Sequence, residues 1–199
     1  MTLARAGLLT LAALATVVAA VAVVGLLLPR DHVEARSAVL PSRPEVVFAA
    51  IADVGAYAAW RRSLSAVEML PPVQGRRRWI EVSGGDRVTM EQVEVRAPHR
   101  LVTRIVDPDL PFGGTWTFEL TPAGSGTRLT ITERGEIYNP IFRALARFIF
   151  GYGATMETFL AELRANLAAS GAAPPGARES AAVTINGSRA ASPCCCGHA

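Results

Sequence analysis

An unbroken hydrophobic run near the start of the chain, from Leu8 to Leu28, is its most prominent pattern. The 21 residues carry no charge, and as a helix they would rise about 30 Å, which matches the hydrocarbon core of a bilayer. We predict a transmembrane helix over residues 8–28, preceded by a short flank over residues 1–7. A cleaved signal peptide is the alternative, but the run is longer than a typical signal core and no convincing cleavage site follows it.

The arginines that flank this run leave its orientation open. Arg5 precedes it, whereas Arg30 and Arg36 follow it. Because the two sides are nearly balanced, the positive-inside rule does not choose between them. We therefore expect a single-pass membrane protein whose domain lies on an undetermined side.

Composition changes again near residue 169, where alanine, glycine, proline and serine become dominant. A segment with so few large apolar residues cannot bury a core. We predict a disordered tail over residues 169–199 and one folded domain over residues 33–168.

Two short helices are predicted at the start of this domain. Ser42 can cap the first of them, with Glu45 completing a capping box. Asp53 can cap the second, in which Tyr57 and Trp60 are three residues apart and face the same way. The two helices form a pair.

Stretches of strand character follow, separated by turns rich in glycine and proline such as residues 111–114. The short connections indicate an antiparallel meander. Alternation gives the sheet one apolar face, which includes Trp116 and Phe118, and one polar face. The predicted strands are Leu64–Leu70, Arg76–Val82, Arg87–Arg96, Leu101–Asp107, Thr115–Leu120 and Thr127–Ile137.

A long helix is predicted from Pro140, with Asn139 as its cap. Apolar residues at spacings of three and four give it one stripe, which should lie on the sheet. Gly151 and Gly153 interrupt the pattern, so a bend or a close approach is expected there. The stripe consists of Ile141, Leu145, Phe148, Tyr152, Met156, Phe159, Leu163 and Leu167. Strands followed by this helix indicate an α+β fold.

Charge and composition exclude several classes of function. The net charge of +3 is spread along the chain, whereas a nucleic-acid-binding protein concentrates its basic residues on one face. All 20 basic residues are arginines, which excludes a lysine Schiff base. The clusters Arg61–Arg62 and Arg76–Arg78 could touch anionic headgroups, although a solvated face is the favoured interpretation.

Metal-ligand spacing is lacking as well. His32 and His99 are isolated and are interpreted as surface residues. The adjacent Cys194, Cys195 and Cys196 cannot easily converge on one ion, so we interpret them as part of a reactive tail. No metal and no cofactor is predicted, and no disulfide is expected in the folded part.

No nucleophile for covalent catalysis is evident, which leaves acid and base chemistry by polar groups. Glu133 is the best catalytic candidate, because it continues the apolar alternation of Leu129 and Ile131. Arg104 or Tyr138 could be its partner, and a raised pKa would suit proton transfer or the binding of a ligand hydroxyl. The alternative is that Glu133 is solvated at the mouth of a cavity.

Three stretches resemble a known superfamily. They are LPSRPEVVFAAIADVGAYAAW at residues 40–60, APHRLVTRIVD at residues 97–107 and GGTWTFELTPAGSGTRLTITERGEI at residues 113–137. Together with the order of elements, they resemble the START, polyketide cyclase and Bet v 1-like (SRPBCC) superfamily, in particular its polyketide cyclase/dehydrase branch. The resemblance implies a helix-grip fold, with an antiparallel sheet wrapped around a long C-terminal helix and an internal cavity for apolar molecules.

Three functions are compatible with this resemblance. The first is a membrane-anchored protein that binds a hydrophobic small molecule or lipid, the second a cyclase or dehydratase that uses Glu133, and the third an interaction domain without a ligand. Enzymatic activity belongs to particular members, so the resemblance does not decide it. The residues expected around the cavity are Trp60, Met90, Trp116, Phe118, Tyr138, Phe142, Phe148, Tyr152, Met156 and Phe159.

Overall fold

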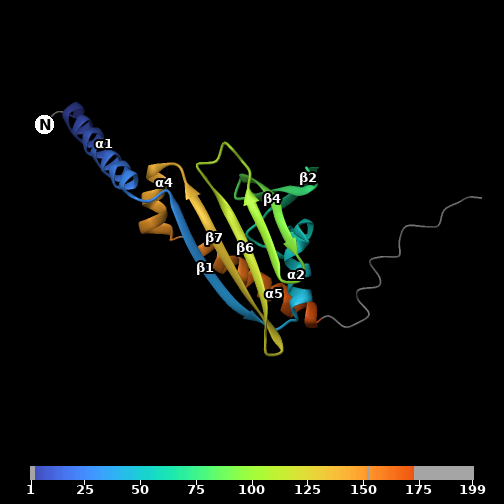
Figure 1. Cartoon of the computed structure of the whole chain (residues 1–199). Helices are drawn as coiled ribbons and strands as arrows, with labels where there is room; N and C mark the ends of the chain where they lie inside the picture. The colour runs from blue at the N-terminus through green and yellow to red at the C-terminus, as the bar shows by residue number, and fades with distance from the viewer. Residues whose placement is uncertain (1–2, 152, 173–199) are drawn as a thin grey trace, which may run out of the picture.

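A seven-stranded antiparallel sheet forms the body of the protein (Figure 1). The computed structural model describes residues 3–151 and 153–172. The strand order is β1-β7-β6-β5-β4-β3-β2, so the meander of six strands ends against β1. The strands are β1 (Asp31–Leu40), β2 (Ala66–Val73), β3 (Arg76–Ser83), β4 (Asp86–Arg96), β5 (Arg100–Ile105), β6 (Phe112–Ala123) and β7 (Gly126–Ile137).

Strand β6 begins three residues before its predicted start, within the segment that was expected to be a turn. Gly113 and Gly114 belong to the strand and pair with Glu136 and Gly135 of β7. A Cβ atom at Gly114 would overlap the backbone oxygen of Arg134. These glycines therefore extend the sheet by allowing close approach, which a composition rule for turns does not distinguish.

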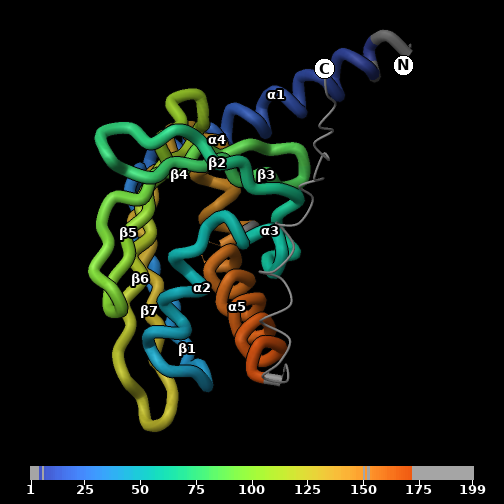
Figure 2. Tube along the Cα trace, turned by 90° about the vertical axis from the view of Figure 1, so that its right-hand side faces the viewer, coloured from blue at the N-terminus to red at the C-terminus, as the bar shows by residue number. Residues whose placement is uncertain are grey.

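Helices α2, α3 and α5 lie on one face of the sheet (Figure 2), and η1 connects α2 to α3. These segments are α2 (Pro44–Ala52), η1 (Val54–Ala56), α3 (Tyr57–Trp60) and α5 (Ala154–Ala172). The predicted capping box is wrong: the N-cap of α2 is Arg43, and the Ser42 carbonyl instead accepts a hydrogen bond from the Thr127 hydroxyl at 2.6 Å. Asp53 precedes η1, and its side chain makes no capping bond.

The apolar core lies between this face of the sheet and the helices. Leu129 and Ile131 of β7 are fully buried, and they meet Met156 and Leu163 of α5 in the same cluster. The predicted alternation of β6 and β7 is thereby confirmed. The α+β architecture of a seven-stranded antiparallel sheet with a C-terminal helix is also confirmed.

The long C-terminal helix is broken where its glycines are. Asn139 caps α4 (Pro140–Leu145) as predicted, accepting hydrogen bonds from the backbone of Ile141 and Phe142. A π-helical turn, η2 (Ala146–Phe150), follows, and then Gly151 adopts a φ of +71° that glycine tolerates. The prediction of one continuous stripe is therefore wrong: Phe148 is exposed, whereas Met156 is buried.

Helix α1 (Leu3–Leu27) extends away from the sheet (Figure 1). Its segment Gly7–Leu27 has a mean hydropathy of 2.5, and none of its apolar 18-residue window is buried. By length and composition it could cross a membrane or act as a signal sequence. At the other end of the chain, α5 runs to Ala172, so it includes the first four residues of the predicted tail. Residues 173–199, including Cys194–Cys196, lie outside the described part of the chain.

Candidate functional site

A cavity of about 580 Å³ lies between the sheet and the helical layer. Strands β3 to β7 supply most of its wall, and α3, α4, η2 and α5 supply residues from the other side. The volume is within the range of small-molecule sites, and the lining is mainly apolar. Its large apolar residues are Leu64, Trp79, Val88, Met90, Ile105, Phe112, Trp116, Phe118, Ile137, Phe142 and Phe159.

Five of the ten residues expected around the cavity lie on its wall. They are Met90, Trp116, Phe118, Phe142 and Phe159. Phe159 is the centre of an aromatic cluster, with ring centroids 5.5 Å from Phe118 and 5.9 Å from Trp116. The rings meet at tilted or edge-on angles, which aromatic pairs prefer, so this wall is apolar and well packed.

The other expected residues lie elsewhere. Trp60 packs behind the wall, with its ring 5.6 Å from that of Phe159, and Met156 is fully buried in the core. Tyr138 is 41% exposed and lines a second, more polar hollow, while Phe148 is 67% exposed. Tyr152 lies outside the described residues. The break at Gly151 explains why residues of one predicted stripe separate in this way.

The cavity wall contains a buried ion pair that the sequence did not predict. Arg61 ends α3 and is only 7% exposed, so its interpretation as part of a surface cluster is wrong. Its Nη1 donates to Glu81 Oε2 at 2.9 Å, and the Trp79 indole donates to the other oxygen of Glu81 at 3.1 Å. The guanidinium also lies about 5 Å from the ring centroids of Tyr57 and Phe159.

This pair gives the cavity a polar end. Within the described part of the chain, the Arg61 Nε has no hydrogen-bond partner. Ser63, Ser83 and Asp86 line the same cavity. The hydroxyls of Ser63 and Ser83 donate to Glu162 and to the Ser63 carbonyl, so this end of the cavity is polar, whereas the aromatic wall is apolar.

Glu133 of β7 also lies on the cavity wall, about one-fifth exposed. Burial raises the pKa of its carboxyl, and the negative charge of Glu34 acts in the same direction, whereas a hydrogen bond from Trp116 opposes the shift. The partners expected from the sequence lie elsewhere, since Arg104 pairs with Glu91. Tyr138 instead faces Arg30, whose guanidinium carbon lies 4.3 Å from its ring centroid.

His32 of β1 is the neighbour that sequence reasoning missed. Its side chain is 14% exposed, lines the cavity and places Nε2 3.7 Å from Glu133 Oε1, so its interpretation as a surface residue is wrong. That distance is too long for a hydrogen bond. Burial lowers the pKa of the imidazole, although Glu34 and Asp31 oppose the shift. Both groups are thus biased toward their neutral forms.

Comparison with known proteins agrees with this geometry. The model of a family described as polyketide cyclase / dehydrase and lipid transport matches residues 32–168. No functionally curated protein matches the chain significantly.

Several solved structures share the fold. A START superfamily protein from Mycobacterium smegmatis matches with a TM-score of 0.56 and 16% identity, over 70% of this chain and 99% of its own. A protein from Thermus thermophilus matches with a TM-score of 0.55 and 24% identity, over 70% and 98%. The di-domain ARO/CYC protein StfQ of the steffimycin biosynthetic pathway matches with a TM-score of 0.57 and 12% identity, over 70% and 52%. At these identities the matches show the fold alone.

Proposed function

Because this chain belongs to the polyketide cyclase / dehydrase and lipid transport family, we propose that it binds a hydrophobic small molecule or lipid in its internal cavity. The observation that carries this proposal is the mainly apolar cavity of about 580 Å³. Filling such a space with an apolar ligand removes both surfaces from water, which is the main source of affinity in sites of this kind.

We further propose that α1 anchors the protein in a membrane. The segment Gly7–Leu27 is long enough to span a bilayer, and it is exposed except near its C-terminal end, where Gly25 packs on α4. An exposed apolar helix of this length is unfavourable in water but favourable in lipid. The ligand would then be taken from, or delivered to, a compartment next to that membrane.

Native mass spectrometry of the full chain, purified in mild detergent, tests the binding proposal. A co-purifying apolar molecule, displaced by a fluorescent apolar probe that binds with one-to-one stoichiometry, is the expected result. A chain that carries no ligand and binds no probe would favour an interaction domain. Resistance to alkaline carbonate extraction tests the anchor, whereas a mature protein that starts after residue 28 would restore the signal-peptide alternative.

A second candidate function is a cyclase or dehydratase activity, favoured by one observation. Glu133 and His32 form an acid–base pair on the cavity wall, with the pKa of Glu133 raised and that of His32 lowered. A carboxyl whose pKa is raised toward neutral pH, as that of Glu133 is, is suited to proton transfer, and a neutral imidazole beside it can accept a proton. Turnover of a polyketide-like substrate that is lost on Glu133→Gln, with binding retained, would support the enzyme.

A further inference from the structure

The segment between β7 and α5 exposes an unusual amount of apolar surface. Phe142 of α4 is 47% exposed, and Phe148 and Ile149 of η2 are 67% and 68% exposed. Three large apolar residues exposed within eight positions form a patch of the kind that marks an interaction surface. The partner that fits this patch is indicated by its location.

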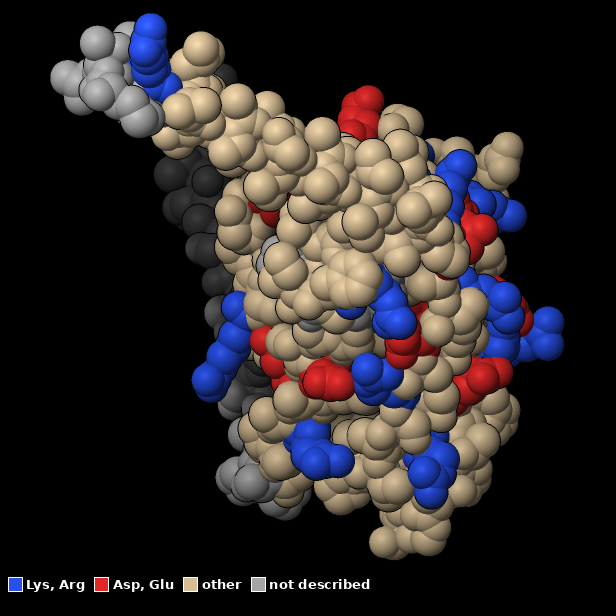
Figure 3. Space-filling view, turned by 90° about the vertical axis from the view of Figure 1, so that its left-hand side faces the viewer, with Lys and Arg blue, Asp and Glu red and all other residues tan. Residues whose placement is uncertain are grey.

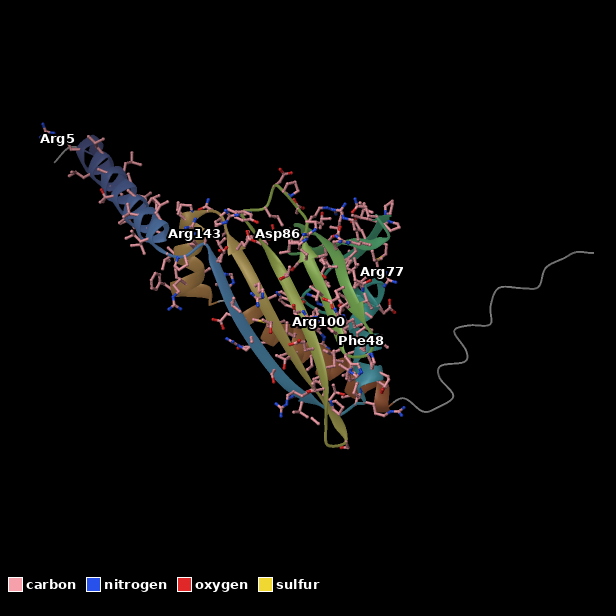
Figure 4. The ribbon with its side chains drawn as sticks, viewed as in Figure 1. Arg5, Phe48, Arg77, Asp86, Arg100 and Arg143 are labelled. Carbon is pink, nitrogen blue, oxygen red and sulfur yellow. The ribbon has the colours of Figure 1, made fainter. Side chains whose placement is uncertain are left out.

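The patch lies next to the domain end of α1. Gly25, in the last turn of α1, packs so closely on Pro140 that a Cβ atom there would overlap its carbonyl. Arg143 fixes the junction: its Nη1 lies 3.2 Å from the carbonyl oxygens of Gly25 and Leu28. Its Nε and Nη2 donate to the Ile137 and Tyr138 carbonyls at 2.9 and 3.0 Å. Figure 4 shows Arg143 where α4 meets α1. Helix α4 is therefore held against α1 by specific contacts.

The surface is largely uncharged across this junction. From the side on which α1 leaves the domain, α1 and the surface below it form one expanse with few charges, and acidic and basic side chains gather farther down (Figure 3). Arg30 and Tyr138 stack near the junction, and Arg147 of η2 is exposed. Arginine and tyrosine at the edge of an apolar surface are typical of the interface between lipid tails and headgroups.

The same segment forms part of the cavity wall. Phe142 and Ala146 both line the cavity, and Gly151, at the break before α5, lines it as well. Phe142 is also half-exposed, so one side chain belongs to the cavity and to the outer apolar patch. A surface that contacted lipid here would bring the cavity wall to the bilayer.

We propose that α4 and η2 dock on the bilayer that α1 crosses, with Phe142, Phe148 and Ile149 in its interfacial region, so that the cavity exchanges its ligand directly with that membrane. This inference rests on the proposed anchor and ligand. Its occupant is the bilayer rather than a protein partner, because Arg143 fixes the patch to the end of α1, the helix that we propose crosses that bilayer. A segment in this position can transfer an apolar ligand without passing it through water.

A depth measurement on the full chain tests the docking. Serine replaces Cys194–Cys196, and single cysteines are introduced by Phe148→Cys, by Leu14→Cys in α1 and by Ser125→Cys in the β6–β7 turn, at the opposite end of the sheet from α1 (Figure 1). Each is labelled with an environment-sensitive fluorophore and reconstituted into phosphatidylcholine vesicles that contain iodide on both sides. We expect lipids with a shallow spin label to quench position 148, and iodide to quench position 125.

The outcomes separate the proposals. Iodide quenching at position 148 equal to that at 125, with position 14 shielded, would overturn the docking and leave the anchor intact. Position 14 open to iodide would overturn both. The double variant Phe148→Ser/Ile149→Ser should slow transfer of a fluorescent fatty-acyl probe from vesicles about tenfold without changing its affinity in detergent. An unchanged transfer rate would contradict direct exchange, whereas a parent chain that binds no probe would refute the ligand proposal alone.

Discussion

The guanidinium of Arg61 and the carboxylate of Glu81 face each other across 2.9 Å on the wall of the cavity, and both side chains are largely buried. Removing a charge from water costs free energy, and each of these two charges offsets that cost for the other. Either charge alone would be buried without a partner. The Trp79 indole adds a hydrogen bond to Glu81, so the carboxylate holds groups from α3 and β3 together.

We predict that Glu81→Gln destabilises the domain by about 3 to 5 kcal/mol, because it leaves a buried arginine unpaired while keeping an acceptor for Trp79. Urea denaturation measures the loss. The control is Glu68→Gln, which breaks the pair with Arg87 at 2.6 Å where both side chains are about half exposed. That variant should keep nearly the parent melting temperature. Equal effects of the two changes would show that the buried pair has no special role.

The raised pKa of Glu133 predicts a pH-dependent stability. At a pH well below 4.5, the ordinary pKa of the group, the carboxyl is neutral in both the folded and the unfolded protein. The buried neutral carboxyl favours the folded state. As the pH rises through the folded-state pKa, this carboxyl must ionise in a buried position, so the stability that the neutral form provides is lost. Glu133→Gln should therefore melt at a higher temperature than the parent at pH 7, and the difference should disappear below about pH 4.

Comparison at equal pH removes the contribution of His32, whose lowered pKa acts in the opposite sense. As the pH falls below 6.5, the imidazole of His32 is protonated in the unfolded chain before it is protonated in the folded protein. Protonation therefore favours the unfolded state, and this loss of stability occurs in both the parent and Glu133→Gln. The control is Glu119→Gln, an exposed carboxylate that pairs with Arg100. A Gln variant at 133 that is less stable than the parent at pH 7 would show that the carboxylate is stabilised in the fold.

Local patterns predicted the elements that depend on local chemistry. The alternation of β6 and β7 and the cap at Asn139 needed only residues close in sequence. The surroundings of Glu133 depended on register instead. Trp116 lies opposite Glu133 on the neighbouring strand β6, and His32 lies on β1, about 100 residues away in the sequence. No spacing in a single sequence specifies such neighbours.

The break in the C-terminal helix limited the prediction of the cavity wall. A stripe assumes one helical phase, but η2 and the positive φ of Gly151 change the phase between Phe148 and Met156. The residues on either side therefore face different surroundings. The glycines indicated a bend, although the direction that the chain takes after it depends on packing against the sheet.

Two methionines form a matched test of the cavity. Met90 lines it, whereas Met156 lies fully buried in the core. Met90→Trp should abolish binding of an apolar fluorescent probe with little loss of stability, because the ring occupies space that is empty without a ligand. Met156→Trp should cost about 1 to 3 kcal/mol through overpacking. Probe titration and urea denaturation of both variants measure these effects, and strong destabilisation by Met90→Trp would indicate a closed, packed interior.

The contact of α1 with α4 predicts different effects for two glycines of one helix. Gly25→Val must displace α1 from Pro140 and break the bonds of Arg143 to Gly25 and Leu28, because its side chain would overlap backbone atoms. Gly7→Val meets open space, and both changes add the same β-branched residue to the helix. In reconstituted protein, trypsin should cut after Arg143 faster in Gly25→Val than in the parent, since its guanidinium loses two acceptors. Gly7→Val should be cut at the parent rate, and both variants should remain with the membrane because the apolar run is preserved. Unchanged protection of Arg143 in Gly25→Val would mean that α1 does not pack on α4 in the bilayer.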